Sequence, residues 1–410
     1  MSGEYPPGGF GGYTPPLTLG PPPGWQPPDP KLGFTFGDLK KEGSLVVIDQ
    51  FVAPMPLFGI GGINGPIQQA HGHLVSESAK GEGFRGNLIP SEHLGRYHQE
   101  KQLISQALNE PDLPKEEFLK RLEMSVALQG VGLMDSMAER LDGLKEAGLH
   151  HSAVNISYGM SQASAVEDKY IEAAMAWSGW GPVEGFKKPL LDNYARAFDL
   201  DTAKLSSSDP AVSGPERSKF QQALADQIAE VMGNNPALKE SQEHFARSVR
   251  ELEKNHNSVV VAASNEGSVL KELAREANSS APLRVNGHFQ ENILAVPETT
   301  VVGSTSGSGP QEKVAEYSSN YEGVDIYANG FAPLPSSTAS QDNAQGTSFA
   351  APKVAQIMAQ LHELYPDKSS DEIESMLKEQ LSHQLLSYDG KVERPVLNGS
   401  AELGMLSRYA

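Results

Sequence analysis

A serine near the carboxyl terminus lies where a nucleophile would be well placed. Ser348 belongs to the segment GTSFAAP, residues 346–352, and apolar residues with helical spacing follow it. We therefore expect Ser348 at the start of a helix, near the positive end of the helix dipole and its unpaired backbone N–H groups. This location favours a hydroxyl whose attack on a substrate creates an oxyanion. Serine is also a preferred helix N-cap, so this segment alone leaves both roles open.

A nucleophilic serine needs a base, and the base needs a partner that orients it. His71 begins the segment HGHLV, residues 71–75, directly after a glycine-rich loop at 59–65. Its imidazole could take the serine proton. Asp49 follows the apolar run LVVI, residues 45–48, and would lie at the carboxyl edge of a sheet, where the active sites of open α/β sheets collect. Taken singly, His71 could be a turn histidine and Asp49 a residue that ends a strand in a turn.

An asparagine in the middle of the chain offers a donor for the oxyanion. Asn265 comes just after the apolar run of the segment VVVAASNEG, residues 259–267. The N–H₂ group of its side chain can donate to a developing negative charge. Asparagine before a glycine is also common in turns, so this alternative stays open as well.

The elements that must position these residues follow from the apolar pattern. Short apolar runs predict strands at 45–48, 153–157, 258–263, 293–296 and 324–327. Helical spacing covers 97–149, most of 160–257, 347–365 and 369–383. Two helices, 215–232 and 236–256, open on Pro215 and Pro236, which suits a first helical turn. Strands that alternate with helices predict an α/β fold, with a mainly parallel central sheet and helices on both faces.

Composition excludes several classes of function. The 410 residues contain no cysteine, so thiolate nucleophiles, disulfides and thiolate metal sites are excluded. A formal net charge of −19 repels nucleic acids and anionic membranes, and we expect neither as a partner. No apolar run is long enough to cross a membrane. The composition is that of a globular protein, and we expect a monomer.

The first 30 residues differ from the rest. They hold ten prolines and seven glycines, a composition that predicts an extended or disordered tail, followed by one domain at 31–410. They lack the basic and apolar regions of a secretory signal peptide. We therefore expect a cytoplasmic protein, or one exported without a classical signal peptide.

Taken together, these segments resemble the subtilisin-like serine protease family, the subtilases. Segment 346–352 matches the nucleophile signature of that family, segment 71–75 matches its histidine signature in part, and segment 260–267 matches its oxyanion strand and turn. Segment 155–159, NISYG, looks like its substrate-binding strand, and segments 317–320 and 324–330 look like the region before its nucleophile. The order Asp49, His71, Ser348 is also that of subtilisin. One departure is that Gln50 and Phe51 follow the aspartate, where the family has Ser or Thr and then Gly.

The resemblance implies a fold and an activity. It implies a subtilisin-like domain, with residues 160–257 as a largely helical insertion, and a serine endopeptidase that acts on polypeptides. It implies roles for four residues, namely Ser348 as nucleophile, His71 as base, Asp49 as the group that orients the base, and Asn265 as oxyanion donor. Substrate would pair as an added strand with Ser157, Tyr158 and Gly159. We predict no cofactor and no metal; many relatives hold a structural calcium, but no dense acidic loop here supports one.

Three other interpretations compete with an active subtilisin-like protease. A catalytically inactive, subtilisin-shaped binding or regulatory protein stays open because of the residues after Asp49. An esterase of the α/β-hydrolase fold would need Gly-x-Ser-x-Gly and a different residue order, and neither is present. The related acid-acting family with a glutamate base is disfavoured by His71 and Asn265.

Only about 40 residues precede the first strand, so we expect folding without an inhibitory pro-domain, unless the chain is already a matured form.

Overall fold

The computed structural model describes most of the chain, with gaps. Described are residues 42–49, 71–80, 87–92, 107–177, 184–277, 283–307, 311–333, 343–386 and 393–397. The tail predicted at 1–30 lies outside the described residues, as do Gln50 and Phe51. The division into a tail and one domain therefore stays a prediction.

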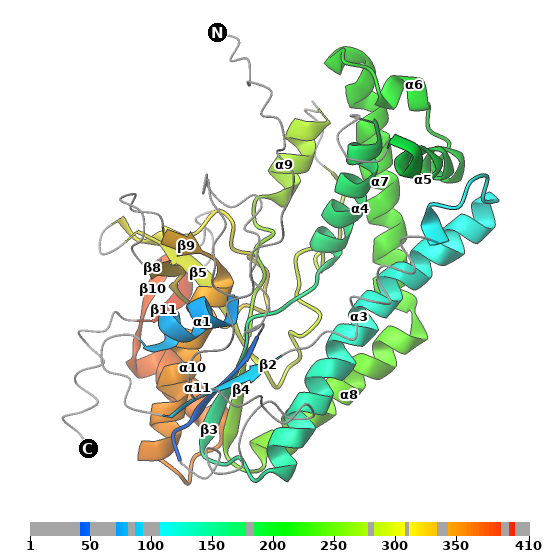
Figure 1. Cartoon of the computed structure of the whole chain (residues 1–410). Helices are drawn as coiled ribbons and strands as arrows, with labels where there is room; N and C mark the ends of the chain where they lie inside the picture. The colour runs from blue at the N-terminus through cyan, green and yellow to red at the C-terminus, as the bar shows by residue number, and fades with distance from the viewer. Residues whose placement is uncertain are drawn as a thin grey trace, which may run out of the picture.

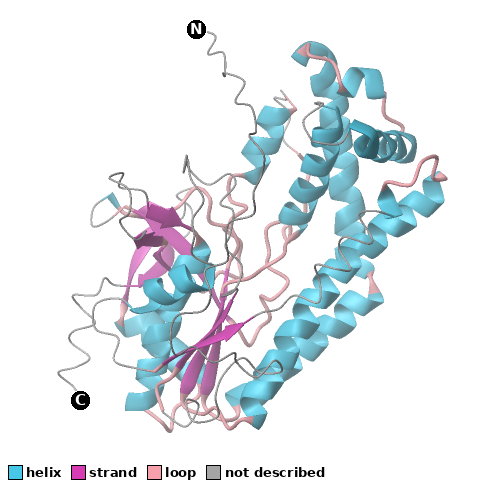
Figure 2. Ribbon diagram, in the orientation of Figure 1, coloured by secondary structure: helices cyan, strands magenta, loops and turns pink. Residues whose placement is uncertain are grey.

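A mainly parallel sheet forms the centre of the molecule, and this confirms the predicted α/β class (Figure 2). Its strand order is β10-β11-β7-β5-β4-β3-β1-β2; β6 pairs with β5, and only β10–β11 and β5–β6 are antiparallel among the described pairs of this sheet. The strands are β1 (Leu45–Asp49), β2 (Leu88–Glu92), β3 (Ser152–Ile156), β4 (Asn257–Ala262), β5 (Thr300–Ser306), β6 (Lys313–Val314), β7 (Ile326–Asn329), β10 (Ser382–Leu386) and β11 (Glu393–Leu397). A separate hairpin pairs β8 (Phe331–Pro333) with β9 (Asn343–Gln345).

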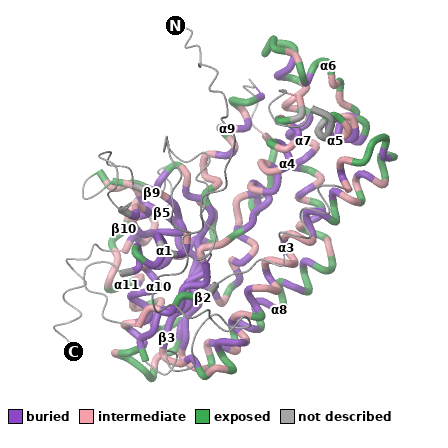
Figure 3. The backbone as a smooth tube through the Cα atoms, in the orientation of Figure 1, coloured by how far each residue is buried: buried purple, intermediate pink, exposed green. Residues whose placement is uncertain are grey.

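The central strands are apolar on both faces because helices cover both faces (Figure 3). In β1, Val46 and Ile48 join one buried cluster, while Leu45 and Val47 join the other. Successive side chains of a strand point to opposite faces, so one short run such as LVVI supplies two cores. All five residues of β1 are buried, including the terminal Asp49.

Helices form a layer on each side of the sheet (Figure 1). On one face α10 packs against β3, β4 and β5, with α1 and α11 beside it; on the other, α8 packs on β4 and α3 packs along α8. The helices are α1 (His71–Lys80), α3 (Lys115–Glu146), α4 (Gln162–Trp177), α5 (Glu184–Phe198), α6 (Thr202–Leu205), α7 (Pro210–Asn234), α8 (Pro236–Glu253), α9 (Val269–Glu276), α10 (Thr347–Leu364) and α11 (Ser370–Gln380). Across the described ranges, none of them is long and apolar enough to span a membrane.

Two predicted elements were wrong, and in both cases polar side chains are the reason. Residues 293–296 form turns rather than a strand, since Asn292 Oδ1 accepts from the Leu294 N–H and Thr299 Oγ1 donates to the Leu294 carbonyl. The helix predicted to open on Pro215 begins at Pro210 instead. There Asp209 is the N-cap and accepts from the Ala211 N–H, so Pro215 lies inside α7.

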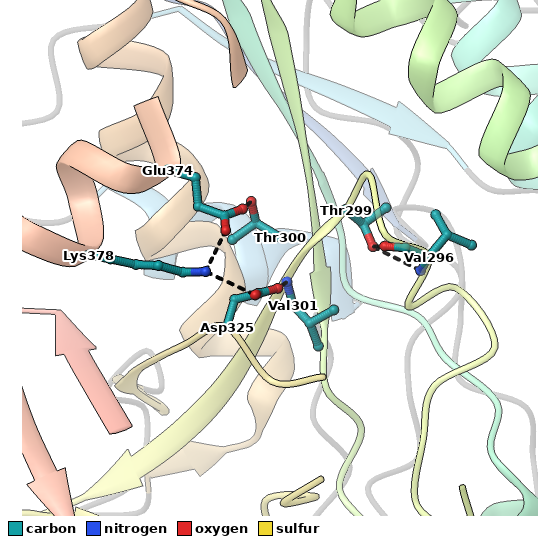
Figure 4. A network of polar contacts seen from close by, with 7 residues as sticks. All are labelled: Val296, Thr299, Thr300, Val301, Asp325, Glu374 and Lys378. Carbon is teal, nitrogen blue, oxygen red and sulfur yellow. Dashed lines mark hydrogen bonds and ion pairs between the residues drawn. The ribbon is translucent and has the colours of Figure 1, made fainter. Parts of the chain in front are cut away.

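A polar network joins α11 to the beginning of β5 (Figure 4). Lys378 Nζ donates to Asp325 Oδ1 at 2.9 Å and also to Glu374. Asp325 Oδ2 accepts from the Val301 N–H at 2.9 Å, and Glu374 accepts from the Thr300 hydroxyl. These bonds attach the last helix to the amino-terminal edge of the sheet, the edge opposite Asp49.

Candidate active site

Three residues predicted from distant segments meet at the carboxyl edge of the sheet. Asp49 is the last residue of β1, His71 is the first residue of α1, and Ser348 is the second residue of α10. His71 Nδ1 lies 2.8 Å from Asp49 Oδ1 and 2.9 Å from Oδ2, and His71 Nε2 lies 3.0 Å from Ser348 Oγ. The imidazole therefore bridges a carboxylate and a hydroxyl, one on each ring nitrogen.

Burial differs among these three side chains in a useful way. Asp49 is fully buried, Ser348 is 6% exposed and the side chain of His71 is 13% exposed. A buried carboxylate is costly unless it is hydrogen-bonded, and the imidazole Nδ1–H is a partner for it. The Phe349 ring packs against the imidazole with 5.5 Å between centroids. The arrangement fixes the imidazole orientation while leaving part of the ring open to solvent.

Ser348 is not the N-cap of its helix, which removes the alternative that its own segment left open. The N-cap of α10 is Gly346, and Ser348 lies within the first turn. The Ser348 carbonyl accepts from Ser157 Oγ at 3.0 Å, and Ser157 Oγ accepts in turn from Asn155 Nδ2 at 2.9 Å. The start of α10 is thus tied to the segment that follows β3.

The amide of Asn265 has a fixed orientation. Its Oδ1 accepts from both the backbone N–H of Thr347, at 2.9 Å, and the Thr347 hydroxyl, at 3.0 Å. Two donors on one atom identify that atom as the oxygen, so Nδ2 points away from Thr347. The preceding residue, Ser264, has φ +82°, a left-handed conformation that is strained for serine.

Ser348 and Asn265 border the same small space. A Cβ added at Gly346 would lie 3.1 Å from Ser348 Oγ and 3.5 Å from Asn265 Nδ2. The missing side chain at Gly346 leaves room between the hydroxyl and the amide N–H₂ group. An oxygen that carries negative charge could accept hydrogen bonds there from Asn265 and from the first-turn N–H groups of α10.

The segment predicted to bind substrate runs beside this space. Ser157, Tyr158 and Gly159 follow directly after β3. The Tyr158 side chain packs against the larger buried cluster, and its carbonyl accepts from Asn292 Nδ2 at 3.2 Å. Ser157 is partly buried, and Gly159, which has no side chain, is exposed. Tyr158 thus faces the core, and the exposed feature of this segment is its main chain.

Glu266 adds a partly buried carboxyl group next to Asn265. Desolvation raises its pKa to about 7, although Ser319 Oγ donates to its Oε2 at 3.1 Å and offsets part of this rise. Gln290 Nε2 donates to the Glu266 carbonyl at 2.9 Å. A carboxyl group that titrates near neutral pH therefore lies one residue from the oxyanion space.

Sequence reasoning missed two residues that shape the site. The hydroxyl of Thr347 orients Asn265, and the buried amide of Asn292 contacts the substrate segment. Thr347 stands within the nucleophile motif, so its position signalled it. Asn292 gives no local signal, because its partners Tyr158 and Ala262 lie 134 and 30 residues away.

Within the described ranges, no group of three or more His, Asp or Glu side chains could hold a metal ion. The expectation of no cofactor and no metal stays a prediction.

Comparison with solved structures returns proteases at low similarity. A lanthipeptide protease matches with a TM-score of 0.40 and 14% identity, covering 88% of this chain and 87% of the other. A cold-adapted subtilisin-like serine proteinase matches with a TM-score of 0.39 and 13% identity, and the match covers 88% of this chain and 91% of the other. The epidermin leader peptide processing serine protease of Staphylococcus aureus matches with a TM-score of 0.39 and 13% identity. This match covers 88% of this chain and 76% of the other. No curated protein matches this chain.

A family comparison is more direct. The model of the subtilase family, peptidase S8, matches residues 205–396. This range includes Asn265 and Ser348, whereas Asp49 and His71 precede it and rest on the geometry above. Residues 205–396, somewhat less than half of the chain, are thus similar to the subtilase family of serine peptidases.

Proposed function

We propose that this protein is a serine endopeptidase in which Asp49, His71 and Ser348 act as a catalytic triad. The observation that carries the proposal is the pair of contacts on His71, with the Asp49 carboxylate on Nδ1 and the Ser348 hydroxyl 3.0 Å from Nε2. Nε2 accepts the proton as Ser348 Oγ attacks a peptide carbonyl, and it returns that proton to the leaving amine. Asp49 holds the imidazole in the tautomer that leaves Nε2 free to accept.

Charge that develops during the attack is stabilised by donors already in place. The carbonyl oxygen of the substrate becomes an oxyanion in the space between Ser348 and Asn265. Asn265 Nδ2 and the Ser348 backbone N–H donate to it, and neither group has to reorient, since Thr347 fixes the amide. Water then hydrolyses the acyl-enzyme with His71 again as the base.

The substrate backbone pairs with the segment at 157–159 as an added strand. The main-chain groups of Ser157 and Gly159 supply the hydrogen bonds. Main-chain pairing is independent of side chains, so it suits internal segments of unfolded polypeptides. We propose a polypeptide substrate, with no nucleic acid, membrane or cofactor involved.

The competing interpretation is an inactive, subtilisin-shaped binding protein. An inactive homologue has no need for a hydroxyl, an imidazole and a carboxylate at hydrogen-bonding distances, nor for an oriented amide beside them. The presence of all four groups with this geometry favours catalysis.

Hydrolysis of fluorescein-labelled casein tests the proposal. Wild-type protein should release internal fragments, and Ser348→Ala should lower kcat by about 10⁶-fold, to background. Ser258→Ala is the matched control, because Ser258 is a buried serine of β4 that also contacts a histidine; this variant should keep its activity. Wild-type protein that is folded yet neither cleaves casein nor reacts with a fluorophosphonate would overturn the proposal in favour of the binding protein.

A further inference from the structure

We propose that Asn292 is a positioning residue that sets the spacing between the substrate segment at 157–159 and the oxyanion segment at 263–265. The inference rests on the proposed function, because it assigns to Asn292 the alignment of a peptide with Ser348. Asn292 contacts the two segments that flank the space between Ser348 and Asn265, and it acts through them.

The hydrogen-bond ladder between β3 and β4 ends just before the site. Its last pair is Ile156 with Val261. Beyond that pair the amide of Asn292 bridges the two chains, since Nδ2 donates to the Ala262 carbonyl at 2.7 Å and to the Tyr158 carbonyl at 3.2 Å. A side chain from a third segment therefore replaces the ladder at the point where the strands separate.

The orientation of this amide is fully determined. Asn292 is 1% exposed, and its Oδ1 accepts from the Leu294 N–H at 3.0 Å. Two carbonyls on Nδ2 and one N–H on Oδ1 leave no alternative assignment of nitrogen and oxygen. Every polar group of the side chain has a partner, so the bridge is rigid.

Close packing around the bridge transmits its position to the site. A Cβ added at Gly159 would lie 2.5 Å from Asn292 Nδ2 and 2.7 Å from Ser264 Oγ. The substrate segment thus lies directly against Asn292 and against the strained residue that precedes Asn265. Without the bridge, two buried carbonyls lose their donor and the segments can relax apart. A displacement of about 1 Å at a positioning group can cost about 100-fold in rate.

The chain supplies a matched control at the opposite edge of the same two strands. Asn257, the first residue of β4, is also fully buried, and its Nδ2 donates to the Leu149 carbonyl at 3.0 Å and the Leu252 carbonyl at 2.9 Å. Its Oδ1 accepts from the Ser152 N–H at 3.1 Å. The bonding pattern is that of Asn292, but no part of the site is near it.

The experiment compares Asn292→Asp and Asn292→Ala with Asn257→Asp and Asn257→Ala. The aspartate variants keep the shape and the acceptor but remove both donors. For each folded variant, kcat/KM is measured on labelled casein, which occupies the substrate segment, and on p-nitrophenyl acetate, which does not reach it. The thermal midpoint is measured in parallel, because all four variants lose a buried amide and should lose similar stability.

We expect both Asn292 variants to lose about 10-fold or more in kcat/KM on casein relative to their loss on the ester. Both Asn257 variants should keep the wild-type ratio of the two activities. The role of Asn292 would be overturned if its variants lost no activity, or if they lost kcat/KM equally on the two substrates. It would also be overturned if the Asn257 variants changed the ratio of the two activities by the same factor. If an Asn292 variant does not fold, its partner variant decides. A wild-type protein inactive on both substrates would instead contradict the proposed function.

Discussion

Among the described residues, two serine–histidine pairs lie at opposite edges of the sheet, and α10 contributes to both. At the carboxyl edge Ser348, in the first turn of α10, lies 3.0 Å from His71. At the amino edge His362, in the last turn of α10, has its Nε2 2.8 Å from Ser258 Oγ of β4. By contact distance alone the second pair is the closer one.

The surroundings of the two histidines distinguish the pairs. His71 has the Asp49 carboxylate on Nδ1 and partial access to solvent. His362 is fully buried, and within the described part of the chain its Nδ1 has no hydrogen-bond partner. Burial, together with nearby His151 and His256, lowers the pKa of His362 to about 4. A contact between serine and histidine is therefore insufficient for catalysis; an orienting carboxylate and an open face are what differ.

Replacing each histidine should separate the pairs most strongly. We expect His71→Ala to lower kcat on casein by about 10⁶-fold, since the serine loses its base. His362→Phe keeps the bulk of the ring and should retain activity per folded molecule within about 2-fold, since it lies outside the site. Comparable losses in both variants would mean that structural integrity, not chemistry at His71, accounts for the effect.

Removing the negative charge of Asp49 tests whether the carboxylate is the decisive difference. In Asp49→Asn the amide can stabilise the wrong tautomer of His71, and we expect kcat to fall by about 10⁴-fold. The fold should persist because the side chain keeps its shape. Turnover measured alongside circular dichroism checks this; near-normal turnover would remove Asp49 from the triad.

The oxyanion donor should have a smaller effect. Asn265→Ala removes one of two donors, so we expect kcat to fall by about 10²–10³-fold with little change in KM. Asn257→Ala is the control, because it removes an asparagine from the opposite end of β4. A change confined to KM in Asn265→Ala would argue against a role in the transition state.

The buried His362 should affect the free energy of unfolding rather than the rate of hydrolysis. The folded-state pKa of His362, about 4, lies below its ordinary value of 6.5, so the unfolded chain binds the proton more readily. Its contribution to stability is present above pH 6.5 and is lost as the pH falls towards 4. Between pH 7.5 and pH 5 the wild type should lose about 2 kcal/mol more than His362→Phe does. Urea unfolding at the two pH values measures this difference; identical losses would contradict it.

The comparison also shows where sequence reasoning succeeds. Ser348, His71 and Asn265 were predictable because each stands in a local motif, and Asp49 was predictable because it follows the apolar run LVVI. Strands such as β1 were predictable because helices cover both of their faces and the run is uniformly apolar. His362 and Asn292 were not predictable, because their partners come from distant segments. In the sequence, His362 lies within a helical pattern and Asn292 beside an apolar run, and neither pattern indicates a polar contact. Residues 293–296 were misassigned for the same reason. Their apolar run alone favours a strand, but hydrogen bonds from the hydroxyl of Thr299 and to the amide of Asn292 hold them in turns.

The most direct test is to find which serine reacts with a fluorophosphonate probe. The reagent requires a nucleophilic hydroxyl with its base, and the labelled residue can be identified by peptide mass spectrometry. We predict one label per molecule, on Ser348, that is abolished in Ser348→Ala and in His71→Ala but retained in Ser258→Ala. Labelling that persists in a folded Ser348→Ala protein, or that never occurs in the folded wild type, would contradict Ser348 as the nucleophile.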